Sequence, residues 1–412
     1  MAEQIWRGGA TAVAQVDHVT PANIEASDIF TVTLADYDGY SSSIQWTAGD
    51  TTAKNVVEGL KAAGIAAAAA GQKPWNEVTC TEDDTKLIIT ADTAGEPFTV
   101  TTATTDGGGN NTQTLTRTAG TANASSTWWA TAENWESGTA PVNDDTVRIP
   151  ANAAYGVDGY DASAVTLHGF DVERGNLRNH GRAKYPLHIT LEDGATNYDA
   201  NLAGTGTNYW QIDNAENINI TQAGSAPGVG RYAQNLQGVS GDSGENLIHV
   251  TCESNQSISL GANAGDDLET DSITITGGDV TVGENVTESD DAGAPDLGMT
   301  GGTVETRCPL GTATKTGGTL THKLGAISAL INDAGEFAWK ADETITSYAG
   351  AGELDAAGDL RAKTITTCVL YSGAILRDPL KKITFTNPIT LSRCGVSSVT
   401  LDIGTNMTLV RA

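Results

Sequence analysis

Two acidic clusters contain the residues of this sequence best suited to hold a metal ion. The first is Asp266-Asp267-Leu268-Glu269-Thr270-Asp271, and the second is Glu288-Ser289-Asp290-Asp291. Calcium is a hard cation that binds several oxygen ligands, so carboxylates at this density suit it. Neither cluster has the spacing of an EF-hand loop or of the calcium-binding nonapeptide repeat. We therefore interpret both as solvated acidic loops and expect no metal site.

Paired carboxylates are also the groups that a glycoside hydrolase requires. That chemistry needs two carboxyl groups about 5–10 Å apart, beside aromatic side chains on which a sugar stacks. Aromatic residues are scarce after residue 119, and the main candidates are Tyr209, Trp210 and Trp339. Because an acidic chain brings some carboxylates to this spacing by chance, a polysaccharide-cleaving enzyme is kept only as an alternative.

The histidines and glycine-rich segments lack the spacing of known catalytic or cofactor-binding motifs. The six histidines are His18, His168, His180, His188, His249 and His322. The glycine-rich segment 106–111 has neither a lysine nor a helical pattern after it, which predicts a plain loop. We expect no catalytic residue, no cofactor and no enzymatic activity, and we expect structural roles for the histidines.

The cysteines point to a reducing environment. Their number is odd and their spacing wide, with no CxxC or Cys/His cluster: Cys80, Cys252, Cys308, Cys368 and Cys394. We expect buried, reduced thiols in a protein made in the cytosol. The N-terminus has no signal-peptide pattern, and the most apolar segment, residues 65–70, is too short to span a bilayer. We therefore expect no membrane association.

The net charge of −28 is unevenly distributed along the chain. Residues 119–300 contain 6 basic and 26 acidic residues, whereas residues 301–412 contain 11 basic and 10 acidic residues. The middle third should repel nucleic acid, because phosphate binding requires Lys and Arg. The near-neutral last third is the better candidate for contact with an acidic neighbour. A basic patch of Arg174, Arg178, Arg182 and Lys184 stands within the acidic region, and we expect it to neutralise acidic loops of this chain or of a second copy.

A compact α+β module is predicted over residues 28–118, after an N-terminal arm at residues 1–27 with one short strand. Such an arm can dock on a partner or cover its own domain. The alternation around Val32, a hairpin partner at 41–46 and an apolar helical face after Thr52 predict two strands and a helix. Strands at 87–90 and 98–102 give the order β-β-α-β-β, with a further edge strand at 112–118. The segment Thr90-Ala91-Asp92-Thr93-Ala94-Gly95-Glu96-Pro97-Phe98-Thr99-Val100 resembles modules of tailed-bacteriophage virion proteins.

Residues 119–127 are small and polar and predict a linker. Next come Trp128-Trp129, Asn134-Trp135, Gly138, Pro141, Asp144-Asp145 and Val147-Arg148-Ile149. This series resembles the opening coil of β-helical surface and virion proteins, and the resemblance implies that the tryptophans close the solenoid end. An open end would expose apolar interior and unpaired strand, so an aromatic cap is also physically reasonable.

A β-solenoid is predicted for residues 128–412. The segment Thr276-Gly277-Gly278 recurs as Thr300-Gly301-Gly302 and Thr316-Gly317-Gly318, each time before an alternating strand. At roughly 20–25 residues per coil the region would hold about 11–14 coils. A pair of flat β-sandwiches is the alternative fold. The short strands expected are Val165–Leu167, Leu187–Leu191, Ile218–Thr221, Leu247–Thr251, Ile258–Leu260, Ile273–Thr276, Val280–Val282, Val304–Thr306, Leu320–His322, Ile365–Leu370, Ile383–Thr386, Val399–Ile403 and Met407–Val410.

These observations predict a mainly β, non-enzymatic structural protein. The resemblance implies a tailed-bacteriophage virion, assembled in the host cytoplasm, and within it a capsid decoration (cement) protein. Its expected partners are the major capsid protein or other virion proteins, and further copies of itself in a homotrimer. A tail fibre or tailspike that contacts host glycans is the alternative.

Overall fold

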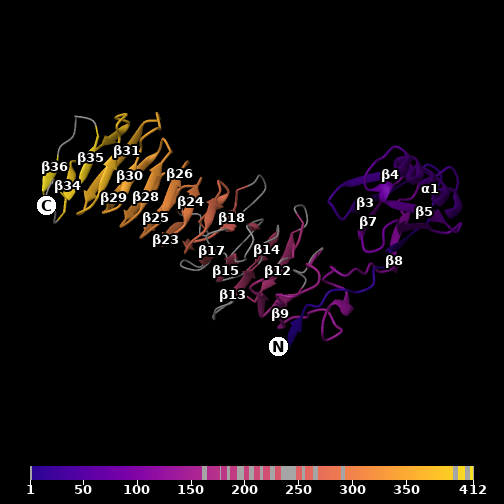
Figure 1. Ribbon diagram of the computed structural model, residues 1–412. Helices are drawn as coiled ribbons and strands as arrows, with labels where there is room; N and C mark the ends of the chain where they lie inside the picture. Colours follow the sequence, from indigo (N-terminus) through magenta and orange to yellow (C-terminus); the bar gives the residue numbers. More distant parts are fainter. Residues whose placement is uncertain are drawn as a thin grey trace.

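The structure is a computed structural model that describes residues 2–159, 165–176, 178–182, 186–192, 199–203, 208–213, 217–222, 228–232, 247–252, 256–262, 268–288, 293–392, 398–403 and 409–411. It is mainly β, with 50% strand and 7% helix, and combines a small N-terminal module with a β-solenoid of about 10 turns from residue 146 on. The predicted fold class is therefore confirmed. Figure 1 shows the solenoid as a rod from β9 to β36, with the module beside its β9 end.

The module contains two antiparallel sheets and one helix. Its sheets have the strand orders β4-β3-β7 and β5-β6-β2-β8. The elements are β2 (Val16–Ala22), β3 (Ile29–Asp36), β4 (Ser41–Thr47), α1 (Ala53–Ala69), η1 (Trp75–Glu77), β5 (Val78–Glu82), β6 (Leu87–Ala91), β7 (Phe98–Thr105) and β8 (Thr114–Thr121). The Thr52 side chain caps α1 by accepting a hydrogen bond from the Asn55 N–H at 3.3 Å. The predicted helix and hairpin are thus present, but β5 is an additional strand that the expected order β-β-α-β-β lacks.

Residues 1–27, expected to be an N-terminal arm with one short strand, contain two strands, and both pair within this chain. Strand β1 (Glu3–Ile5) pairs in parallel with β9 (Thr146–Ile149) of the solenoid. Strand β2 lies between β6 and β8 of the module. The chain therefore begins in the solenoid, leaves it to build the module, and returns. The outgoing and returning segments pair with each other through a bridge between Val13 and Ala124.

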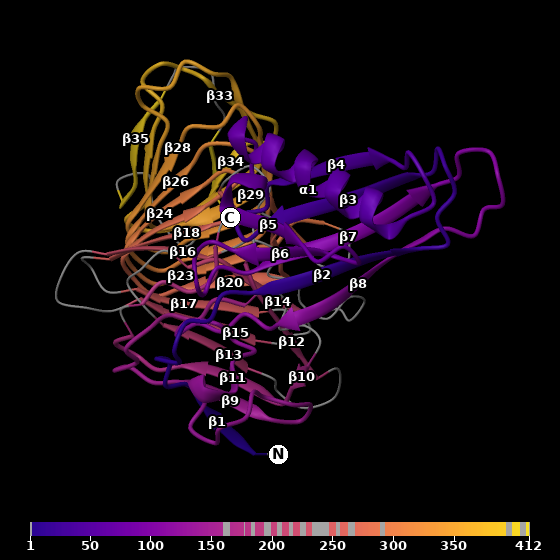
Figure 2. The same cartoon turned by 90° about the vertical axis from the view of Figure 1, so that its right-hand side faces the viewer.

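The solenoid is built from parallel strands in two long sheets, visible in Figures 1 and 2. The 15-stranded sheet, called the long sheet below, contains β1, β9, β11 (Gly169–Val172), β13 (Asp199–Ala203), β15 (Asn217–Gln222), β17 (Leu247–Cys252), β20 (Ser272–Ile275), β23 (Asp296–Met299), β25 (Leu310–Lys315), β27 (Ile327–Asn332), β29 (Thr344–Gly350), β31 (Lys363–Leu370), β33 (Ile383–Phe385), β34 (Ile389–Leu391) and β36 (Leu409–Arg411). The 9-stranded sheet, called the second sheet, contains β16 (Gly228–Tyr232), β18 (Gln256–Leu260), β21 (Asp279–Val282), β24 (Thr303–Thr306), β26 (Thr319–His322), β28 (Glu336–Trp339), β30 (Glu353–Asp355), β32 (Ile375–Arg377) and β35 (Thr400–Asp402). Smaller sheets contain β10 (Thr166–Leu167), β12 (Leu187–Leu191) and β14 (Trp210–Asp213), and β19 (Leu268–Glu269) with β22 (Val286–Thr287).

The solenoid has about 10 turns, close to the 11–14 expected, and it differs from the prediction in where the turns begin and in how much their length varies. Residues 128–145 form a cap, with the short helix η2 (Ala132–Asn134), and the turns begin at residue 146. Coil length also varies nearly twofold, since Val304 pairs with Leu320 whereas Ile218 pairs with Ile248.

The Thr-Gly-Gly repeat forms a stacked corner between the two sheets. Gly278, Gly302 and Gly318 all have positive φ, and Gly335 continues the stack although its segment lacks the repeat. Each corner carbonyl accepts a hydrogen bond from the next coil, as from Thr319 N–H to Gly302 O at 2.9 Å. A Cβ on any of the last three glycines would overlap the carbonyl of the coil below. The glycines are therefore required for the coils to stack at this corner.

The first end of the solenoid is closed by three tryptophans. Trp6, Trp129 and Trp135 are buried, and the Trp135 ring packs edge-on against Trp6 at 5.0 Å and Trp129 at 4.8 Å between centroids. The predicted tryptophan cap is therefore present, with Trp6 added from the N-terminal segment. Trp128 instead packs against Tyr37 of the module, 5.7 Å away.

Candidate functional site

One arginine connects the module to the solenoid. The Arg182 guanidinium lies 3.6 Å from the centre of the Tyr37 ring and forms ion pairs with Asp38 at 3.2 Å and Asp158 at 3.8 Å. Burial, followed by the charge of Asp158, raises the pKa of Tyr37 well above its ordinary value. Arg182 thus neutralises acidic groups of its own chain, as expected for the basic patch. Lys184 lies outside the described residues.

Two pockets lie at this junction, on either side of Pro97 and Phe98. One has a volume of about 170 Å³, and its lining includes four acidic residues together with Tyr37 and Arg182. The other, of about 310 Å³, is lined by Trp128, Arg117 and buried Asp17. The Arg117 guanidinium forms an ion pair with the Asp17 carboxylate at 2.7 Å. Asp17 and Arg117 both belong to the module, so this pair stabilises its sheet, whereas the Arg182–Asp38 pair joins the module to the solenoid.

His180 is fully buried and connects neighbouring segments of the solenoid. Its Nδ1 accepts a hydrogen bond from the Val157 N–H at 3.1 Å, so its Nε2 donates to the Asn176 side-chain oxygen at 3.2 Å. Its ring stacks on Trp210 at 5.2 Å. Burial lowers the pKa of His180 to about 3, so the ring is neutral at ordinary pH. A ring held in this way lacks access to a substrate.

A lysine is enclosed in the solenoid interior at the corner after β25. Lys315 is fully buried, and its Nζ donates hydrogen bonds to the Ala334 carbonyl and to Asn332 Oδ1. Asn332 in turn donates to the Glu353 carbonyl at 2.8 Å and to the Tyr348 hydroxyl at 3.5 Å. Burial lowers the pKa of Lys315 to about 8. The chain of bonds passes through successive coils and fixes their register.

A second buried group lies at the corner after β26. His322 Nε2 donates to the Gly325 carbonyl at 2.6 Å, and its Nδ1 accepts from the Thr306 hydroxyl at 2.8 Å. Burial lowers the pKa of His322, partly offset by the bond to Gly325. This histidine also connects adjacent coils rather than facing solvent.

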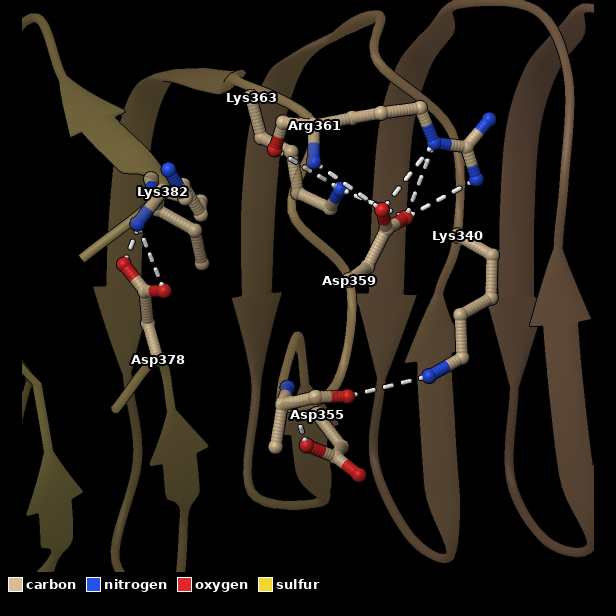
Figure 3. Close-up of polar contacts among 9 residues, drawn as sticks. Lys340, Asp355, Asp359, Arg361, Lys363, Asp378 and Lys382 are labelled. Atoms are coloured by element: carbon tan, nitrogen blue, oxygen red, sulfur yellow. Dashed lines mark hydrogen bonds and ion pairs between the residues drawn. The ribbon is translucent and has the colours of Figure 1, made fainter. Parts of the chain in front are cut away.

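The third buried group is an ion pair near the C-terminal end. The Lys363 Nζ donates to Asp359 Oδ2 at 3.0 Å, and the Arg361 guanidinium donates to the same oxygen at 2.9 Å, as Figure 3 shows. Lys363 is 2% exposed and lies over the Trp339 ring at 5.7 Å. Burial by itself would raise the pKa of Asp359, but the Arg361 N–H and the Lys363 and Arg361 side chains outweigh it and lower this pKa to about 2.

The residues proposed for sugar stacking are mostly enclosed. Trp210 is 1% exposed and Trp339 is fully buried, so neither ring can receive a sugar. Tyr209 is half-buried, and its backbone N–H donates to the His180 carbonyl at 2.9 Å. The structure therefore brings no stacking platform together from these three residues.

The acidic clusters are only partly within the described residues. Leu268 and Glu269 form β19, whereas Asp266, Asp267 and residues 289–291 lie outside the described part. A different carboxylate group, Glu58, Glu82 and Asp84, is the one whose oxygens converge within the described residues. Lys54 and Lys61 already pair with its members, Asp84 at 2.9 Å and Glu82 at 3.2 Å. Sequence reasoning missed this group because its members come from α1, from the end of β5 and from the turn after it.

Four of the five cysteines are confirmed as buried free thiols: Cys80, Cys252, Cys308 and Cys368. Burial raises the pKa of Cys80, Cys308 and Cys368 to about 12, so these thiols are protonated and unreactive. Cys394 lies outside the described residues.

Comparison of this chain with protein-family models, with curated proteins and with solved structures finds no match in any of the three. Among the described residues, no helix is both long and apolar enough to cross a bilayer. The class defined by the fold is a β-solenoid protein with an inserted α+β module.

Proposed function

We propose that this chain is a non-enzymatic structural protein of a tailed-bacteriophage virion, and specifically a capsid decoration protein. The observation that carries the proposal is the bonding of the ionisable groups buried in the solenoid. His180, Lys315, His322 and the Asp359–Lys363 pair are each hydrogen bonded to their own chain. These groups stabilise the stack of coils, which is what a scaffold under mechanical stress requires.

The resemblance of the module and of the solenoid opening to virion proteins supplies the assignment to a phage particle. The decoration protein would act by burying surface across neighbouring capsomers of the major capsid protein, and so resist internal pressure without chemistry. Stable attachment requires roughly 1,500 Å² or more of buried surface per copy. The homotrimer expected from the sequence is part of this proposal.

Burial of Trp210 and Trp339 disfavours the polysaccharide-cleaving alternative, because both rings are inaccessible to a sugar. The tail-fibre alternative differs in its partner, a host glycan in place of the capsid.

A sedimentation assay tests the proposal directly. The purified protein is mixed with undecorated heads of the phage that encodes it, and separately with host cells, and each mixture is pelleted. We expect the protein to pellet with heads at a fixed ratio to the capsid protein and to remain in solution with cells. Pelleting with cells but not with heads would overturn the decoration role in favour of receptor binding. Release of reducing sugar from host capsule would instead indicate an enzyme.

A further inference from the structure

From β15 to β36 the long sheet presents an outer face that is nearly free of charge, whereas the outward positions nearer its first end include Glu3, Arg148 and Asp171. Two rows of side chains point outward along its strands, at alternate positions to the buried core residues. One row is Asn217, Leu247, Ser272, Asp296, Thr312, Ala329, Ser347 and Thr367. The other is Asn219, His249, Thr274, Gly298, Thr314, Ile331, Ala349, Val369, Thr390 and Val410. Apart from His249, Asp296 is the one acidic or basic residue in the two rows, which we call the uncharged face.

The second sheet of the same coils is different. Its outward rows contain Glu305, Glu336, Glu353, Asp355, Arg377 and Asp402. The chain as a whole has a net charge of −28. The lack of charge on the long sheet is therefore a property of this face rather than of the composition.

We infer that the uncharged face is the surface through which a second copy of this chain packs side by side with the first. Two copies with a charge of −28 repel each other, and repulsion is weakest where acidic residues are absent from both surfaces. In a closed homo-oligomer every copy presents the same face toward the symmetry axis, so an uncharged face on one copy meets uncharged surface on its neighbours. The small side chains of both rows allow two sheets to approach to about 10 Å, the ordinary distance between packed sheets.

The size of the face is sufficient for a specific contact. The rows cross β15, β17, β20, β23, β25, β27, β29, β31, β34 and β36. At about 4.8 Å between strands and about 7 Å between outward neighbours along a strand, the rows cover about 600 Å². Two such faces bury about 1,200 Å² in total, the lower end of the range for specific protein interfaces.

The composition of the face also has the organisation of an interface. Its apolar centre is Ile331, Ala349 and Val369 in adjacent coils, and Ile331 remains 36% exposed in the single chain. Threonine and serine surround these residues, with Thr314 on one side and Thr367 on the other. An apolar centre with an uncharged polar rim is typical of surfaces that bury each other.

Sedimentation equilibrium across a micromolar range of protein tests this inference. We expect the wild-type protein to have the mass of two or more 42.6 kDa chains. Ile331→Glu and Ala349→Glu should reduce it to the mass of one chain, because each places a carboxylate at the centre of the contact. Thr319→Glu adds the same charge to the outward row of the second sheet and should leave the mass unchanged. Added salt should strengthen the wild-type association, because it screens the repulsion between acidic copies.

A single-chain mass for the wild-type protein, or equal loss of association in all three variants, would overturn the inference. Circular dichroism melting of each variant shows whether it is folded, and the two positions on the long sheet provide independent tests. The inference rests on the proposed function only for its role in the virion. A monomeric protein that still pellets with heads would refute the packing surface and leave the decoration role standing.

Discussion

Replacing Gly318 by alanine should destabilise the solenoid far more than the same change at Gly358. Both glycines have positive φ, +69° at Gly318 and +78° at Gly358, so both substitutions impose the same kind of backbone strain. Around Gly358 there is no atom within 4 Å of the added Cβ. At Gly318 the added Cβ would overlap the carbonyl oxygen of Gly302 in the coil below.

The magnitude follows from what that oxygen does. A non-glycine residue in the left-handed region costs about 1–2 kcal/mol, which is the whole effect expected at Gly358. The Gly302 carbonyl accepts the Thr319 N–H at 2.9 Å, so moving it away from the new methyl group breaks a bond between coils. Loss of this hydrogen bond between Thr319 and Gly302, together with crowding of the corner, adds about 2–3 kcal/mol to the destabilisation. Gly318→Ala should therefore cost about 3–5 kcal/mol in total.

Urea unfolding followed by tryptophan fluorescence and far-ultraviolet circular dichroism measures both variants against the wild type. The fluorescence of the tryptophan cap and the dichroism of the strands should shift together if the stack loses stability as a unit. Equal loss of unfolding free energy in Gly318→Ala and Gly358→Ala would refute the argument, because backbone strain alone would then explain both.

Three further changes test the buried groups and the junction. Lowering the pH from 6.5 toward 3 should destabilise the protein, because in this range His180 binds a proton only in the unfolded state. The loss of unfolding free energy is about 2–3 kcal/mol at pH 4.5. Urea titration of wild type and His180→Gln measures it, and an equal pH dependence of the two proteins would contradict the prediction. Asp359→Asn leaves buried Lys363 without its counter-charge and should cost about 3–5 kcal/mol in thermal unfolding, whereas the double variant Asp359→Asn, Lys363→Met should recover much of this loss. Arg182→Ala should change the free energy of unfolding by less than about 1 kcal/mol, because the ion pairs of Arg182 are half-exposed. It should nevertheless raise the radius of gyration in small-angle scattering, because the module is held less tightly against the solenoid. The control Arg7→Ala removes the pair with Glu136 and should leave that radius unchanged.

The regular parts of the fold were predictable because their signals are local. Alternation of buried and exposed residues is complete in β3, and the α1 helix has both its cap at Thr52 and its apolar face in one continuous segment. The Thr-Gly-Gly corners were predictable for the same reason. Strands such as β27 and β29 were missed, because two consecutive residues face outward in each, Ser328-Ala329 and Thr346-Ser347, which breaks the alternation.

The sequence by itself determined the mainly β class, the tryptophan cap, the corner glycines and the acidic character of the chain. Only the tertiary structure decided which distant groups meet: β1 with β9, Arg182 with Tyr37, and Lys363 with Trp339. It also decided that Trp210 and Trp339 face inward, and that the outward side chains of the long sheet from β15 to β36 form an uncharged face. The physical reason is that the length of each coil determines which residues of successive coils become neighbours. Coil length varies here, because the loops between strands differ in length and their sequence does not reveal the pairing of the strands.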